Sequence, residues 1–172
     1  MSKRTYGFKA HCEIAKLMAD YYRAHTGDAA FAALHHLGDA IREATKAYWR
    51  ETHGRHKLES TITVRSAEAR KQYAARHKEH AVPVACLIDQ IKNDRNITSL
   101  DIERIVRTHT HFVHITNAEH SRLNKLFRVT MPPGWRLGCC PFSRYHAAEI
   151  KLEFDESGAS RCTCEYDNVG VA

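Results

Sequence analysis

The sequence contains no long run of apolar residues, no internal repeat and no low-complexity linker. No segment approaches the roughly 18 apolar residues that a membrane-spanning helix needs. The first residues, MSKRTYGFKAHCEIAK, include no apolar stretch of the kind found in signal peptides. The absence of repeats excludes solenoids and repeat arrays. These absences predict a cytoplasmic protein without a membrane partner.

The sequence also lacks cysteine pairs with the C-x2-C spacing of common zinc knuckles. In the cytoplasm its six cysteines are expected to be thiols or metal ligands rather than disulfides. The only local clusters are Cys139-Cys140 and Cys162-x-Cys164. These four residues either hold a structural Zn2+ or are buried thiols, and their spacing favours buried thiols.

The composition indicates one soluble domain with a basic surface. A chain of 172 residues with 43% apolar residues can bury a sizeable core, so residues 1–172 are interpreted as a single domain. The 26 lysines and arginines exceed the 20 acidic residues. This excess suits a polyanionic partner without identifying one. The 13 histidines are an excess of the side chain that most often ligates metals and acts as a base near neutral pH.

Residues 1–56 have the apolar periodicity of a helical pair. Apolar residues recur at helical spacing over residues 8–23 and again over residues 28–51, and Gly27-Asp28 separates the two segments. Asp28 is a plausible N-cap for the second helix. We expect two antiparallel helices, whose apolar stripe forms core or the interface of a homodimer.

Residues 57–130 mix strand and helix patterns. β-branched residues over 58–64 indicate a strand, whereas helices are predicted over 66–77 and 84–92. Two capping boxes, Thr98-Ser-Leu-Asp101 and Thr116-Asn-Ala-Glu119, predict helices that run to about 108 and to 127. Between these two helices, residues 111–116 are predicted as a strand.

Residues 131–172 are predicted to form a carboxy-terminal loop and hairpin. Met131-Pro-Pro-Gly134 ends the preceding helix. Residues 150–154 have the pattern of a strand, and residues 161–166 could pair with it as a hairpin. The fold class expected for the whole chain is therefore α+β.

Glu79 and His80 are the residues whose chemistry we single out first. Hydrolysis of a phosphodiester needs a base that deprotonates water and a cation that offsets charge on the phosphoryl oxygens. Neutral imidazole can be the base, and carboxylate and imidazole can hold the cation. Neighbouring residues on an extended backbone point to opposite sides, so one could face a metal and the other the attacking water.

The segment Glu79-His80-Ala-Val-Pro83 resembles the first half of the HNH, or His-Me finger, endonucleases. The strand and capped helix start that carry His120 resemble the second half of this family. The resemblance implies a ββα-metal core with an inserted helical segment, preceded by the helical pair and followed by the hairpin tail. It also implies His80 as general base, and Glu79 and His120 as ligands of Mg2+ or Mn2+. The match covers at most residues 76–127.

The chain departs from the family pattern at its central asparagine. His111 and His114 lie where that asparagine is usual, and Asn117 lies closer to the last histidine than expected. These three residues are candidates for a supporting role. Glu119 is expected to serve the capping box rather than a metal, and Cys12 has no evident base partner for a nucleophilic role.

The expected function is metal-dependent cleavage of nucleic acid, with DNA favoured over RNA, as in phage, mobile-element and restriction settings. Two alternatives stay open, namely a nucleic-acid-binding protein without catalysis and a zinc-stabilised interaction protein. Basic residues near the motif are candidates for phosphate contacts, which confer affinity without sequence choice. These residues are Arg70, Lys71, Arg76, Lys78 and Arg122, with Arg144-Tyr145 as a further candidate.

Overall fold

The computed structural model describes residues 7–53, 64–71 and 76–154 and divides the chain into two compact units. Unit 1 comprises Met1–Leu58 and Val84–Thr110, and unit 2 comprises Glu59–Pro83 and His111–Ala172. Each unit is thus built from segments that are separated in the sequence. The expectation that residues 1–172 form a single domain stays a prediction.

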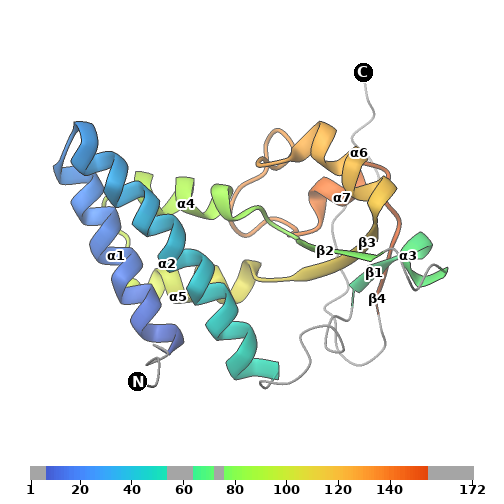
Figure 1. The fold of residues 1–172 in the computed structure, drawn as a ribbon, viewed down its shortest axis with the longest axis horizontal. Helices are drawn as coiled ribbons and strands as arrows, with labels where there is room; N and C mark the ends of the chain where they lie inside the picture. Colours follow the sequence, from blue (N-terminus) through green and yellow to red (C-terminus); the bar gives the residue numbers. More distant parts are fainter. Residues whose placement is uncertain (1–6, 54–63, 72–75, 155–172) are drawn as a thin grey trace. The chain divides into compact units, whose positions relative to one another are not determined.

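Unit 1 is helical, and its largest elements are α1 (Phe8–Ala24) and α2 (Gly27–His53). The two helices lie side by side and antiparallel, coloured blue and teal (Figure 1). Alanines at 15, 19, 33 and 44 are buried, and such small side chains let two helices pack closely. The helical pair predicted for residues 1–56 is therefore confirmed over its described part.

Helices α4 (Val84–Asn93) and α5 (Ser99–His109) complete unit 1. Both pack against α1 and α2. Arg23 of α1 donates hydrogen bonds to the carbonyl oxygens of Ile91 and Lys92 at the end of α4, at 3.1 and 3.3 Å. The helical segment inserted between the two halves of the motif therefore shares a core with the amino-terminal pair.

Unit 2 contains a four-stranded sheet with the order β2-β3-β1-β4. β3 pairs antiparallel with β2 and parallel with β1, and β4 pairs antiparallel with β1. The strands are β1 (Val64–Ser66), β2 (Arg76–His80), β3 (Phe112–Thr116) and β4 (Leu152–Phe154), and the helices are α3 (Ala67–Lys71), α6 (Asn117–Phe127) and α7 (Ser143–Ala147).

The core of unit 2 lies on one face of the sheet, under α6 and α7. Val113 and Ile115 of β3 are buried there with Leu123 of α6 and Tyr145 of α7. Side chains of a strand alternate between its faces, so the residues of β2 opposite Val113 and Ile115 share this face. The register makes these residues Glu79 and His77.

The α+β class is confirmed, whereas one predicted helix is wrong. We expected a helix over 66–77, but α3 ends at Lys71, and β2 begins at Arg76. The ladder with β3 supplies backbone hydrogen bonds that outweigh the local helical preference of this basic segment. Of the strand predicted over 58–64, only Val64 lies in the described part, where it begins β1 (Val64–Ser66), and the hairpin partner 161–166 lies outside the described residues.

None of the helices in the described ranges combines the length and the apolar character needed to cross a bilayer.

Candidate metal centre

The strand β2 carries the first part of the candidate site. Its sequence is Arg76-His-Lys-Glu-His80, and alternation places His77 and Glu79 on one face of the sheet. Lys78 and His80 lie on the other face. The face that carries His77 and Glu79 is the one covered by α6.

Helix α6 supplies the second part, and its capping box determines where the helix begins. The Thr116 hydroxyl accepts a hydrogen bond from the backbone N–H of Glu119 at 3.2 Å, and the Glu119 carboxylate accepts one from the backbone N–H of Thr116 at 2.8 Å. Because Thr116 also ends β3, the helix follows the strand without a loop. His120, in the first turn, is thereby held above β2.

His77, Glu79 and His120 form one cluster. The Oε2 atom of Glu79 lies 3.3 Å from Nε2 of His120 and 3.5 Å from Nε2 of His77. The two imidazole rings are stacked with centroids 3.6 Å apart. Each residue offers a ligand atom within 4.8 Å of the other two. The structure therefore brings the predicted ligands Glu79 and His120 together, and adds His77 to them.

The side chains of the cluster are partly open to solvent. The exposed fraction is 38% for His77, 26% for His120 and 19% for Glu79. A cation bound by these groups could thus be reached by water and by a phosphate. The two ligand types also suit a divalent cation, since imidazole nitrogen and carboxylate oxygen are common metal ligands.

Arg144 of α7 is a fully buried arginine that orients Glu79. Its guanidinium donates to Oε1 of Glu79 at 2.8 Å and also to the carbonyl oxygen of His80. It donates further hydrogen bonds to the carbonyl oxygens of Ala81 at 3.0 Å and Phe127 at 3.1 Å. Oε1 is therefore engaged by Arg144, while Oε2 faces the two imidazoles.

The surroundings favour the neutral form of His120. Burial and the neighbouring His77 lower the pKa of His120, and these effects outweigh the opposite effect of Glu79. Neutral imidazole is the form that ligates a metal. Nε2 of His120 also lies 2.9 Å from Nδ2 of Asn124, one helical turn further along α6. The nitrogen that faces Glu79 thus has an amide neighbour as well.

His80, the predicted general base, lies outside this cluster. Its ring centroid is 4.5 Å from that of Phe112, its neighbour across the ladder, on the opposite face of the sheet from Glu79. Its carbonyl oxygen accepts hydrogen bonds from Arg144 and from the hydroxyl of Tyr145. Burial raises the pKa of Tyr145, so that hydroxyl remains a proton donor. The backbone of His80 is thus held in place at the end of β2.

The predicted supporting residues Asn117, His114 and His111 have different surroundings. Asn117 is exposed at the first position of α6, and His114 is buried in β3 on the face opposite Glu79. The ring of His111 lies 5.5 Å from the ring of Phe142. Glu119 serves its capping box and also accepts a hydrogen bond from Ser66 at 2.6 Å, as expected for a structural carboxylate.

The basic residues predicted to contact phosphate are dispersed. Arg70 and Lys71 lie on α3 and pair with Glu153 and Glu68 at 2.8 and 3.0 Å. Lys78 lies over the Phe112 ring, with its Nζ 4.8 Å from the ring centroid, on the face of the sheet opposite the cluster. Arg122 is exposed on α6 and donates to the carbonyl oxygen of Glu149 at 3.3 Å. The side chain of Arg76 lies outside the described part, and Arg144 is buried rather than free to grip a phosphate.

Cys140 is excluded as a ligand of the structural zinc that was the alternative to buried thiols at the cysteine clusters. Cys140 is disulfide-bonded, whereas Cys139 is a free thiol. Zinc binds cysteine as thiolate, so a disulfide sulfur cannot complete a four-thiolate site. The prediction that all six cysteines are thiols or ligands is therefore wrong at Cys140. Cys162 and Cys164 lie outside the described residues.

Unit 1 has a second group of potential ligands, His35, His36 and Asp39, exposed on α2. Asp39 pairs with Arg42 at 2.6 Å and with His35 at 3.3 Å. The three side chains of this group are exposed on a single helix, whereas those of the cluster in unit 2 are half-buried and come from two elements. This group is therefore a weaker metal site than the cluster in unit 2.

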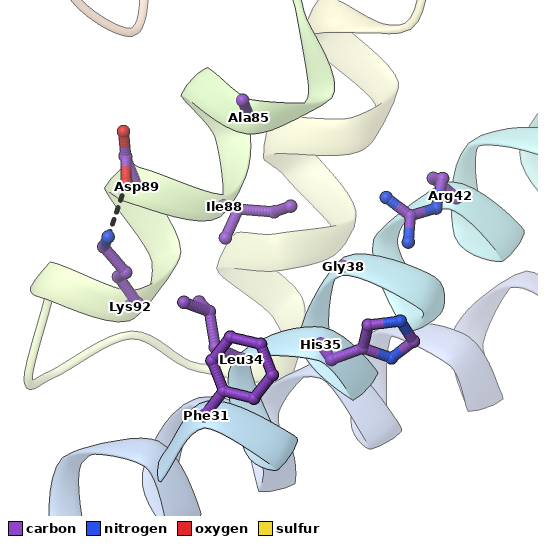
Figure 2. A pocket seen from close by; sticks show the side chains of 9 residues that line it. All are labelled: Phe31, Leu34, His35, Gly38, Arg42, Ala85, Ile88, Asp89 and Lys92. Atoms are coloured by element: carbon purple, nitrogen blue, oxygen red, sulfur yellow. Dashed lines mark ion pairs between the residues drawn. The ribbon is translucent and has the colours of Figure 1, made fainter. Parts of the chain in front are cut away.

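A hollow of about 320 Å³ lies between α2 and α4 of unit 1. Figure 2 shows Leu34 and Ile88 among its apolar side chains. The basic side chains at its edge are already paired within their own helices, Arg42 with Asp39 and Lys92 with Asp89. The hollow is thus a largely apolar surface, and the basic side chains at its edge are neutralised by their own acidic partners.

His77 was not singled out from the sequence, and Arg144 was expected to contact phosphate rather than Glu79. The H-x-E spacing of His77 and Glu79 would have indicated a shared face if residues 76–80 had been recognised as a strand. Arg144 meets Glu79 across 65 residues of sequence, a separation for which no local pattern exists. Asn124 was missed too, although its spacing of four from His120 is a signal for contact on a helix.

The candidate metal centre therefore consists of His77 and Glu79 on β2 and His120 on α6, with Arg144 of α7 behind Glu79. All four residues belong to unit 2. Comparison with protein-family models, with characterised proteins and with solved structures finds no match to this chain.

Proposed function

We propose that this chain is a metal-dependent phosphodiesterase that cleaves nucleic acid, with DNA as the expected substrate. The observation that carries the proposal is the convergence of Glu79 and His120, from β2 and α6, on one partly exposed cluster. Their order along the chain is that of the HNH, or His-Me finger, motif that Glu79-His80 and the capped start of α6 resemble. A ββα-metal arrangement formed by β2, β3 and α6 is part of the proposal.

Glu79 and His120 would hold the cation, and Arg144 would orient Glu79. The cation, when bound, would offset the negative charge that develops on the phosphoryl oxygens during cleavage. Arg144 keeps Oε1 of Glu79 engaged at 2.8 Å, which limits rotation of the carboxylate. Partners that orient a ligand in this way commonly change metal affinity or activity by 10- to 100-fold or so.

His80 is the base of the proposed mechanism, and its position restricts where the phosphate would bind. A general base must come within hydrogen-bond reach of the water that it deprotonates. Because His80 and Glu79 point to opposite faces of the sheet, a phosphate that meets both would lie at the end of β2, where the strand stops. Activity would require the His80 ring to leave its contact with Phe112.

Phosphate contacts are proposed for Arg122 and for the α3 residues Arg70 and Lys71. Arg122 is exposed on α6, the helix that also carries His120. The α3 residues pair with carboxylates at the surface, where ion pairs are worth at most about 1 kcal/mol. Such pairs can be exchanged for phosphate at little cost.

The proposal is tested by incubating supercoiled plasmid with the protein and Mg2+, Mn2+ or Zn2+, with a chelator as reference. Glu79→Gln and His120→Ala are expected to slow nicking by at least about 100-fold, as loss of a catalytic group commonly does. Glu13→Gln, on α1, and His25→Ala, at the C-cap that follows it, change the same residue types at exposed positions and should leave the rate unchanged. Absence of cleavage of DNA and RNA with every metal would overturn the proposal.

His80→Ala tests the assignment of the base separately. If His80 is the base, the variant loses nicking and still binds DNA in a gel-shift assay. Nicking that survives His80→Ala would reject this assignment and leave the metal centre in place. A wild-type protein that binds DNA but ignores both chelator and His80→Ala would be a nucleic-acid-binding protein instead.

A further inference from the structure

The cluster in unit 2 contains one imidazole more than the motif predicted. His77 lies two residues before Glu79 on β2 and therefore on the same face of the sheet. Its Nε2 is 3.5 Å from Oε2 of Glu79, close to the 3.3 Å at which Nε2 of His120 lies. One carboxylate oxygen thus faces two imidazole nitrogens from two different elements.

We propose that His77, Glu79 and His120 together form a two-imidazole, one-carboxylate site that takes Zn2+ or a similar transition-metal ion in preference to Mg2+. The role of that ion in cleavage rests on the function proposed above. The composition and selectivity of the site do not depend on it.

The spacing of the three ligand atoms fits a small divalent ion. Two atoms that each lie about 2.1 Å from a tetrahedral cation are about 3.4 Å apart. The separations of 3.3 and 3.5 Å around Oε2 of Glu79 are close to this value. The rings of His77 and His120 already lie against each other, so assembly of the site would need side-chain adjustment only.

The chemistry of the ligands favours a transition metal. Mg2+ strongly prefers oxygen ligands and keeps several waters, whereas imidazole suits Zn2+, Co2+, Ni2+ and Cu2+. With two of three ligands being imidazoles, the site offers Mg2+ a single carboxylate oxygen. Zinc sites with two histidines, one carboxylate and an open position are a recognised catalytic type.

The charge around the site suits an anionic substrate. The carboxylate of Glu79 is balanced by the guanidinium of Arg144 at 2.8 Å, and His77 and His120 are neutral when they ligate a metal. A bound dication would therefore leave the site with a net charge of about +2, which attracts phosphate. The exposed fractions of His77 and His120, 38% and 26%, leave room for such a ligand.

Metal binding to the full chain, stripped with a chelator, tests the inference by isothermal titration with Zn2+, Co2+ and Mg2+. One equivalent of Zn2+ is expected to bind at least about 100-fold more tightly than Mg2+. His77→Ala should weaken Zn2+ binding at least about tenfold, and His77→Gln, which keeps more of the side-chain volume, should do the same. Far-UV circular dichroism verifies that both variants fold.

His35→Ala is the matched control, since His35 belongs to the other group of potential ligands, on α2. It should leave the titration unchanged. The absorption spectrum of the Co2+ form should show a low-symmetry site without the charge-transfer bands of thiolate ligands, which separates this centre from binding at Cys139.

Several results would overturn the inference. One is that His77→Ala and His77→Gln bind Zn2+ as tightly as the unchanged protein. Another is that His35→Ala no longer binds Zn2+. The third is that Mg2+ binds as tightly as Zn2+. Selective Zn2+ binding without cleavage of any nucleic acid would leave the site standing and reject the proposed function. Cleavage that is supported by Mg2+ and unaffected by His77→Ala would reject the inferred zinc site and leave the proposed function in place.

Discussion

Replacement of Arg144 by alanine tests whether this buried arginine holds the metal centre together. The side chain is fully buried and donates to Glu79 and to the carbonyl oxygens of His80, Ala81 and Phe127. It thereby links α7 to the end of β2 and to the end of α6. Its removal would leave the carboxylate and three carbonyl groups without this donor.

The expected loss follows from the burial of the pair. Breaking a buried ion pair by removing one partner typically costs about 3–5 kcal/mol. Glu79 keeps 19% of its side chain exposed, so water can partly solvate the freed carboxylate. We therefore expect Arg144→Ala to lower the free energy of unfolding by about 3 kcal/mol, near the lower limit. With an m-value of about 2 kcal/mol/M, the urea midpoint would fall by about 1.5 M.

Urea denaturation followed by circular dichroism and tryptophan fluorescence measures this loss. Arg136→Ala, at an exposed position of unit 2, is the control and should change stability by no more than about 0.5 kcal/mol. A double-mutant cycle with Glu79→Gln isolates the pair, for which we expect a coupling of about 1–3 kcal/mol. A loss below about 1 kcal/mol in Arg144→Ala, or no coupling, would refute the positioning role.

Two smaller perturbations test the elements around the site and the reactivity of the thiols. Thr116→Ala removes the N-cap of α6 and should cost about 1 kcal/mol in urea denaturation, while unchanged stability would contradict the capping box. Burial, and next the charge of Glu103, raise the pKa of Cys12 to about 12. At pH 8 Cys12 stays protonated, so iodoacetamide should modify the free, half-buried Cys139 before Cys12, and Cys12 only after unfolding. Mass spectrometry of the native and urea-unfolded protein checks this order, and equal rates at both thiols in the native protein would contradict it.

Features that depend on neighbouring residues were predictable from the sequence. Both capping boxes, at Thr98-Asp101 and Thr116-Glu119, are present as expected, because each is formed by groups three residues apart. The amino-terminal helices followed from apolar residues at helical spacing, and the strand at 112–116 from its β-branched and aromatic residues. The contact between Glu79 and His120 was predicted from the resemblance to the HNH, or His-Me finger, motif rather than from any local pattern.

The tertiary structure alone decided the remainder of the site. Residues 76–80 form a strand because β3 supplies their hydrogen-bond partners, and that strand places His77 beside Glu79 and turns His80 to the opposite face. Arg144 reaches Glu79 only because the core of unit 2 brings α7 against β2. The sequence by itself thus determined the amino-terminal helices and the two capped helices and, through the family resemblance, two of the candidate ligands. The third ligand, the orienting arginine and the direction of His80 depend on contacts between distant segments, which local physical preferences do not encode.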